Sequence, residues 1–434
     1  MDDTEHGVFT TRAPLRPNSI GLSIVNLKNF KKSIVLIKKL THPNLIIIYL
    51  ISLAHLTHDT YTSFLSPLLP LLIKKHGISL TYAAFLSVAL RLPSLSNPFI
   101  GIISDKIGPK YFIIFPVTIS GIAMCLLGNA SNYIVIIVLL FITGISSAFF
   151  HVPAPVLIKN TTNKYLGSSM SSYQIGGELS RTIGPILVIT TISWFGLTRI
   201  YYLIPIAIIV SVILLLKLKN NTNIQKDKIE EEISINLATL KRFLIEKKYL
   251  LLSITGLLLT KSFTASIIAA FLPTYLSMKG KGLWFSGGAL SIFFASAMIG
   301  VLFTGILSDK FGRNNILKIF VFITPFAMLF FLFVQGNMIF LAIILLGFIS
   351  CSTTPVVLAY VQESNFRFPS VANGIYMTMN FIFSSLSVLG FGKLSDLISI
   401  DKALFVFALG SFIGIPFIFF LPKINTNISN EQNE

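Results

Sequence analysis

The chain is a succession of long apolar stretches separated by short polar turns. The hydrocarbon core of a bilayer is about 30 Å thick and is crossed by about 20 apolar residues of helix. These stretches are too long and too continuously apolar for the strands of a membrane barrel. The pattern therefore predicts an all-α membrane protein with twelve transmembrane helices, at about 45–73, 80–104, 111–129, 132–158, 167–194, 199–217, 249–278, 284–308, 314–335, 337–363, 370–399 and 401–421.

One polar segment divides these predicted helices into six and six. Residues 218–248 are rich in charged and amide side chains, which predicts a cytoplasmic linker between an N-terminal six-helix bundle, 45–217, and a C-terminal one, 249–421. The remaining residues, 1–44 and 422–434, form polar tails. The N-terminal tail contains the basic amphipathic stretch NLKNFKKSIVLIKKL, for which we expect a place on the membrane surface, with organelle targeting as the alternative.

Composition agrees with a membrane protein and indicates its orientation. The 434 residues are 53% hydrophobic and 12% charged, whereas soluble domains carry about 25% charged residues. Lys and Arg concentrate in cytoplasmic loops. With a cytoplasmic N-terminus, 24 of the 34 basic residues fall on the cytoplasmic side and 6 on the other, so both termini are predicted to be cytoplasmic. The net charge of +17 then faces anionic lipid and not nucleic acid. We expect a multi-pass protein of a bacterial inner membrane.

A loop sequence occurs twice, once in each half. GIISDKIGPK begins at Gly101 after the second predicted helix, and GILSDKFGRN begins at Gly305 after the eighth, 204 residues later. Two such repeats, related by an axis along the membrane normal, are typical of secondary transporters with a substrate site between the halves. The candidate gating residues in the two copies are Gly101, Asp105, Lys106, Gly108, Lys110, Gly305, Asp309, Lys310, Gly312 and Arg313.

This repeated loop resembles the signature loop of the major facilitator superfamily, and the resemblance extends over about residues 45–421. It implies that the loop is a conformational latch between the two halves. Four further stretches resemble the fosmidomycin-resistance type of drug exporter: HLTHDTYTSFLSPLLP, LRLPS, SSAFFHVPA and GGELSRTIGP. Two antiporter motifs are missing. The fourth helix lacks Arg-x-x-Gln-Gly, and Gly184-Pro185 in the fifth is followed by ILVI, without a glycine pair. The general antiporter motifs therefore give no support for proton coupling.

Charged side chains occur deep within three predicted helices, the first, the second and the fifth, although a charge there costs at least about 3 kcal/mol. In the first helix, helical spacing places Ser52, His55, Asp59, Thr62 and Ser66 on one face. At 1.5 Å per residue, Asp59 lies about 20 Å from the cytoplasmic end, and Arg91 of the second helix lies at a similar depth. The fifth helix carries a second polar face, formed by Ser171, Gln174, Glu178 and Arg181.

Two interpretations of these charges remain open. In the structural one, the ion pairs Asp59–Arg91 and Glu178–Arg181 hold the N-terminal half together. In the functional one, a carboxylate gains and loses a proton during transport, and the arginines bind an anion. The candidates for proton coupling are then Asp59, Glu178, His55 and His151, and those for substrate binding are Arg91, Arg181, His58 and Gln174.

His151 is followed by Pro153 and Pro155, which should break or kink the fourth helix and free backbone carbonyls. A hydrogen bond to those carbonyls is the alternative to a proton-relay role for this histidine. Lys261, Lys393 and Asp396 also lie within predicted helices, and no motif assigns them a role. Cys125 and Cys351 lie in apolar runs and predict neither a disulfide nor a metal site.

The favoured function is proton-coupled efflux of a small drug-like or anionic metabolite by alternating access. The alternative is a proton-coupled uptake symporter for a small organic anion. An enzyme is not supported, since the chain has no Gly-x-Ser-x-Gly motif, metal-ligand cluster or phosphate-binding loop. We expect no cofactor and no metal. The expected partners are a small-molecule substrate, protons and membrane lipid, for a protein that acts as a monomer.

Overall fold

The computed structural model describes residues 43–97, 100, 104, 110–161, 166–219, 248–354, 356–357 and 369–421. Within these residues the regular elements are helices, and there is no strand. Eight helical stretches are long and apolar enough to cross a membrane, and Leu80–Ser96 and Met338–Ser350 are shorter apolar helices. Large apolar side chains such as Trp194 and Phe333 lie exposed on their surface, 73% and 69%. The prediction of an all-α membrane protein is confirmed.

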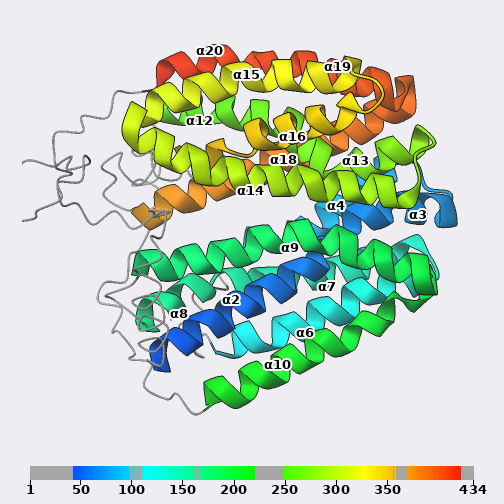
Figure 1. The fold of residues 1–434 in the computed structure, drawn as a ribbon, viewed down its shortest axis with the longest axis vertical. Coiled ribbons are helices and arrows are strands. Elements are labelled where there is room, and N and C mark those ends of the chain that lie inside the picture. The colour runs from blue at the N-terminus through cyan, green and yellow to red at the C-terminus, as the bar shows by residue number, and fades with distance from the viewer. Residues whose placement is uncertain are drawn as a thin grey trace, which may run out of the picture.

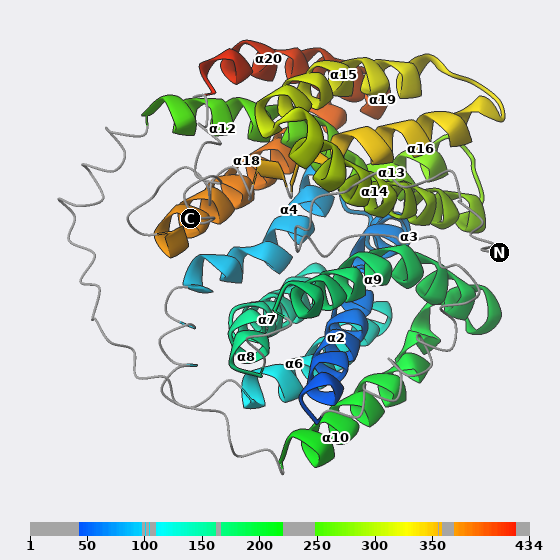
Figure 2. The same ribbon diagram turned by 60° about the vertical axis from the view of Figure 1, so that its left-hand side comes forward.

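The first half of the described chain contains eight α-helices. They are α2 (Pro43–Thr62), α3 (Leu65–His76), α4 (Leu80–Arg91), α6 (Tyr111–Leu126), α7 (Tyr133–His151), α8 (Ala154–Thr161), α9 (Leu166–Phe195) and α10 (Ile204–Lys219). Figures 1 and 2 show α2, α6, α7, α8, α9 and α10 gathered in one group, while α3 and α4 lie toward the helices of the second half.

The described part of the second half also contains eight α-helices. They are α12 (Lys248–Lys261), α13 (Ile267–Met278), α14 (Leu283–Phe311), α15 (Arg313–Phe333), α16 (Met338–Ser350), α18 (Pro369–Ile398), α19 (Ile400–Gly410) and α20 (Gly414–Phe417). These helices form the upper group in Figure 1.

Several predicted helices are interrupted close to their polar residues. The first is broken at Ser63 and Phe64, because Pro67 at the start of α3 has no N–H with which to continue the hydrogen bonding of α2. The fourth ends at His151, ahead of Pro153, as the sequence predicted. The seventh contains a π-helical turn, Ser262–Ser266, between α12 and α13. Such interruptions free backbone groups and change the direction of nearby side chains.

Glycines bring α9 directly against α2. A Cβ atom at Gly176 would lie 2.7 Å from the carbonyl oxygen of Ser52, and one at Gly177 would lie 2.5 Å from Cε1 of His55. Only glycine allows a backbone approach this close. The polar faces of the first and fifth predicted helices are thereby held in contact.

Among the described helices, the largest contacts between the two groups are those of α3 with α13, α4 with α18, and α9 with α14, and α3 also touches α14. Ser66 Oγ donates to the carbonyl oxygen of Ala270, 3.0 Å away, between α3 and α13. The carboxylate of Asp396, near the end of α18, accepts hydrogen bonds from the backbone N–H groups of Leu80 (2.9 Å) and Thr81 (2.8 Å) and from the Thr81 hydroxyl (2.5 Å). This carboxylate therefore caps the first turn of α4 from the other half of the chain.

Candidate functional site

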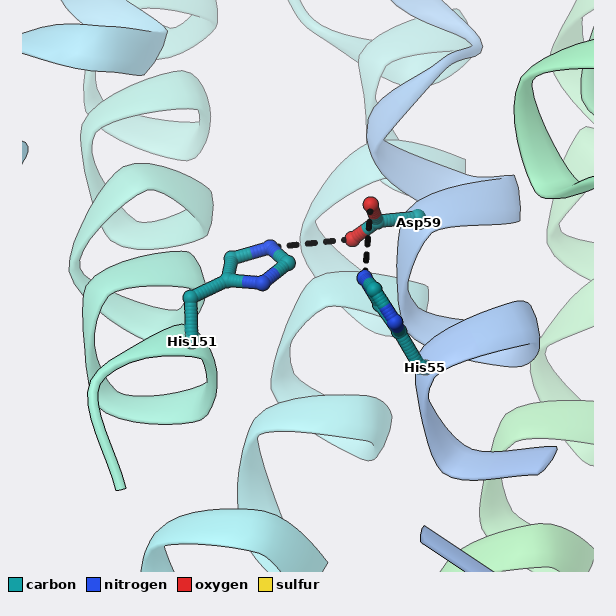
Figure 3. A group of neighbouring side chains, drawn as sticks. All are labelled: His55, Asp59 and His151. Carbon is teal, nitrogen blue, oxygen red and sulfur yellow. Dashed lines mark ion pairs between the residues drawn. The ribbon is translucent and has the colours of Figure 1, made fainter. Parts of the chain in front are cut away.

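Asp59 lies at the centre of a cluster of three histidines. Its side chain is buried, and its carboxylate oxygens lie 3.3 Å from His55 Nε2, 2.9 Å from His58 Nδ1 and 3.1 Å from His151 Nε2. His55 and Asp59 are one helical turn apart on α2. Figure 3 shows His151 at the end of α7, pointing toward Asp59 from the other side. Sequence spacing indicated the first pair, and the fold adds the others.

His55 has its hydrogen fixed by a backbone carbonyl. Its Nδ1 lies 2.7 Å from the carbonyl oxygen of Tyr173, and this oxygen can only accept, so Nδ1 must be the donor. A neutral imidazole carries one ring hydrogen, so Nε2 would then present a lone pair to Asp59 Oδ2. Two lone pairs repel at this distance. The contact is favourable only when a proton is bound to His55 or to Asp59.

The hydrogen bonds of His58 lead to the same conclusion. Ser146 Oγ donates to the carbonyl oxygen of Pro116 at 2.8 Å, and so Ser120 must donate to Ser146, at 2.8 Å. The Ser120 hydroxyl is then free only to accept, which makes His58 Nε2, 3.0 Å away, the donor. The other nitrogen of a neutral His58 would again turn a lone pair toward Asp59.

His151 differs because a neutral ring satisfies its contacts. The Tyr173 hydroxyl, 3.3 Å from His151 Nδ1, can donate to it, which leaves Nε2–H to donate to Asp59. Its side chain is also 36% exposed, whereas that of His58 is fully buried. Two bound protons are therefore needed to place a hydrogen in every contact of the cluster, and His151 links the cluster to solvent.

Aromatic rings hold the histidines in place. The Tyr173 ring stacks on His55 with centroids 4.0 Å apart, and the Phe150 ring stacks on His58 at 4.9 Å. Because His55, Asp59 and His151 each offer a ligand atom within 4.8 Å of the others, these residues could also hold a metal ion, where the sequence had suggested none.

A second polar group lies on α4 and α9. Arg181 Nη1 lies 3.4 Å from Glu178 Oε1, so the expected Glu178–Arg181 pair is present. Arg91 Nη1 donates to Ser384 Oγ of α18 at 2.8 Å. Within the described part of the chain, the ion-pair partners of Asp59 are the three histidines, and the expected Asp59–Arg91 pair is not formed. The two arginines are exposed to solvent, as is Gln174.

The surroundings of His58 differ from those of the exposed substrate-binding candidates. His58, which the sequence grouped with the substrate-binding candidates, is buried, and its Nδ1 lies beside Asp59. Sequence reasoning missed Tyr173, Ser120 and Ser146, because common polar residues in apolar helices carry no distinctive pattern.

The two loop copies are described to different extents. Gly101, Asp105, Lys106 and Gly108 of the first copy lie outside the described residues. In the second copy Gly305 and Asp309 lie within α14, and only their backbone is described. Of the others, Lys110 directly precedes α6, Lys310 is exposed near the end of α14, and Arg313 begins α15. Gly312 joins α14 to α15 with φ +85°, a conformation that favours glycine.

Comparison with known proteins identifies the family. The model of the Major Facilitator Superfamily matches residues 51–388, and the chain therefore belongs to this family of membrane transporters, which are not enzymes. A model of the tRNA-methyltransferase O N-terminal domain matches residues 1–44, ahead of most of the described chain.

The individual proteins to which the chain is similar share less than a quarter of its residues in the aligned regions. The chain is 24% identical over 340 residues to the fosmidomycin resistance protein of Escherichia coli (strain K12), covering 75% of this chain and 80% of that protein. A crystal structure of the nucleoside transporter NupG matches 87% of this chain and all of that chain, with a TM-score of 0.68 and 16% identity. The D-xylose-proton symporter matches 87% of this chain and 97% of that one, with a TM-score of 0.68 and 15% identity. These two structures establish the fold alone.

Proposed function

We propose that the protein exports a small drug-like or anionic metabolite in exchange for protons, by alternating access between two six-helix bundles. The bundles are residues 45–217 and 249–421, joined by a cytoplasmic linker at 218–248, with cytoplasmic tails at 1–44 and 422–434. The proposal of export is supported by the relative in Escherichia coli, whose name describes resistance to a drug. A bacterial inner membrane fits the same relative.

The Asp59 cluster is the proposed proton site. The observation that supports it is the fixed direction of the hydrogen bonds at His55 and His58, which leaves two nitrogens facing a carboxylate. The cluster gains favourable contacts when it takes up protons and loses them on release. Such a group can exchange protons as the surrounding helices open and close. Glu178 is a second carboxylate candidate on α9.

Charge connects this proton site to the arginines. Arg181 interacts electrostatically with Glu178 and with Asp59. Protons bound at the Asp59 cluster neutralise negative charge near Arg181. Arg181 then attracts an anion more strongly. Binding of protons and of an anion therefore support one another. Such positive coupling between proton binding and anion binding favours the second candidate function, a proton-coupled uptake symporter for a small organic anion.

The direction of transport distinguishes the two functions. If the protein exchanges its substrate for protons, everted membrane vesicles with an acidic interior should accumulate radiolabelled fosmidomycin, the drug after which the Escherichia coli relative is named. A symporter instead accumulates its substrate in right-side-out vesicles with an acidic exterior. A flux that is equal with and without the pH gradient in both preparations would refute proton coupling.

A further inference from the structure

Lys261 is a charge within the membrane that the proposed proton site does not use. It is the last residue of α12, midway along the apolar stretch Lys248–Met278, and its Nζ donates to Thr354 Oγ1 at 2.8 Å. The π-helical turn Ser262–Ser266 follows directly. Both features are typical of functional sites in membrane proteins, because a charge there is costly and π turns inside helices are frequent at such sites.

Lys261 faces the arginines of the first half. Its ammonium group interacts electrostatically with Arg181, Glu178 and Arg91. The three cations come from α12, α9 and α4, and Arg91 is in turn hydrogen-bonded to Ser384 of α18. Arg91 is exposed, the Arg181 side chain is 48% exposed, and Lys261 is partly exposed. Solvent therefore reaches a cationic surface to which both halves of the chain contribute.

The charges of this surface do not balance. Among the described residues that interact there, Glu178 is the one carboxylate not already paired with histidines, and it interacts with two of the three cations, Arg181 and Lys261. Like charges held close together repel one another, so a cluster that served only to hold helices together would be expected to neutralise its cations. A ligand with two negative charges would restore the balance. Guanidinium groups bind paired oxygens of phosphonates and carboxylates, and an ammonium group adds a point charge.

We infer that Arg91, Arg181 and Lys261 together form the binding site for a small anion that carries two negative charges, and that Lys261 is the contact from the second half. The inference rests on the proposed function and adds the substrate class. A ligand held from both halves is bound only while they are close together, which links its binding to the alternating movement.

The test is equilibrium binding to the purified full chain by calorimetry at about pH 8, where a phosphonate is doubly charged. Two pairs of probes share a ring and differ in charge: phenylphosphonate with benzenesulfonate, and phthalate with benzoate. We expect at least one dianion to bind about tenfold more tightly than its matched monoanion. Lys261→Gln should weaken that dianion at least about tenfold, or 1.4 kcal/mol, and leave the monoanion within about twofold. Lys402→Gln, at an exposed lysine of α19, should change neither.

Equal affinity of the wild-type protein for both members of each pair would overturn the inference. The same holds if Lys261→Gln weakens dianion and monoanion alike, which is the result for a purely structural lysine. If Lys261→Gln does not fold, Lys261→Arg keeps the charge and must keep the preference for the dianion. The binding measurement uses no pH gradient, so a negative result leaves the proposed proton coupling intact. Conversely, an absence of pH-driven flux in vesicles would not change the expected binding of a dianion.

Discussion

At the scale of single residues, the buried carboxylate of Asp59 is tolerated because three histidines surround it. The sequence predicted the pairing of His55 with Asp59, since residues four apart share a helix face. It could not predict that His151, which follows 92 residues later, would meet the same carboxylate, because that contact depends on how α7 packs on α2. Nor could it fix the positions of hydrogens, which depend on partners such as the Tyr173 carbonyl.

Asp59→Asn should abolish transport driven by a pH gradient, with flux in everted vesicles falling at least about tenfold. The amide cannot ionise, but its NH₂ group can donate to a neutral His55 or His58, so thermal stability should change little. The matched control is Asp401→Asn, which alters a carboxylate that pairs with Lys279 at an exposed site. Normal pH-driven flux in the Asp59 variant would exclude this carboxylate and leave Glu178 as the candidate.

Ser120→Ala should lower the number of protons that transport requires. Without the serine, His58 no longer needs a hydrogen on Nε2 and can place it on Nδ1, where it donates to Asp59 while the ring stays neutral. The slope of log flux against pH should then fall from about two toward one. Ser211→Ala, which removes hydroxyl contacts between α6 and α10 away from the cluster, should keep the wild-type slope. An unchanged slope in the Ser120 variant would mean that His58 is not among the groups that exchange protons.

At the scale of helices, the apolar pattern predicted where most elements lie but not how they are interrupted or paired. The fifth predicted helix, 167–194, is found as α9, Leu166–Phe195. The first is instead divided into α2 and α3, because Pro67 interrupts an otherwise continuous apolar run. The packing of α4 on α18 depends on contacts between residues far apart in the sequence. Gly392 is an example, because a Cβ atom at this position would lie only 2.6 Å from the carbonyl oxygen of Leu80.

The cap that Asp396 forms on α4 should hold one end of the two helix groups together. A hydrogen bond to a charged group contributes about 1.5–3 kcal/mol, so Asp396→Asn should shift the protein toward opening at that end. Spin labels at the exposed positions Lys74 and Lys281 should report a larger population of long distances by pulsed electron resonance. Asp401→Asn, which breaks a 2.7 Å pair with Lys279 within one group, should leave the distances unchanged. Identical distributions in Asp396→Asn and the wild-type protein would show that the cap does not control opening.

At the scale of the whole molecule, the distribution of basic residues predicts its orientation, which depends on the membrane and not on internal contacts. Reporter fusions after residues 235 and 430 should both indicate the cytoplasm. A control fusion after residue 280, in the turn between α13 and α14, should report the opposite side. One cytoplasmic and one external signal from the first two fusions would mean that the number of crossings between them is odd, and the prediction of six helices in the second half would be wrong.

The hydrogen bonds that leave the cluster through His58 stop at the carbonyl oxygen of Pro116. A carbonyl oxygen accepts a hydrogen bond but has no hydrogen to donate. It therefore cannot pass a proton from Ser146 to a further group. Among the histidines of the described chain that contact Asp59, the one with an exposed edge is His151. If the cluster exchanges protons as proposed, we expect it to take them up and release them on the side of His151. A protein built in this way can carry protons in step with its own movement without letting the membrane potential leak away while it stands idle.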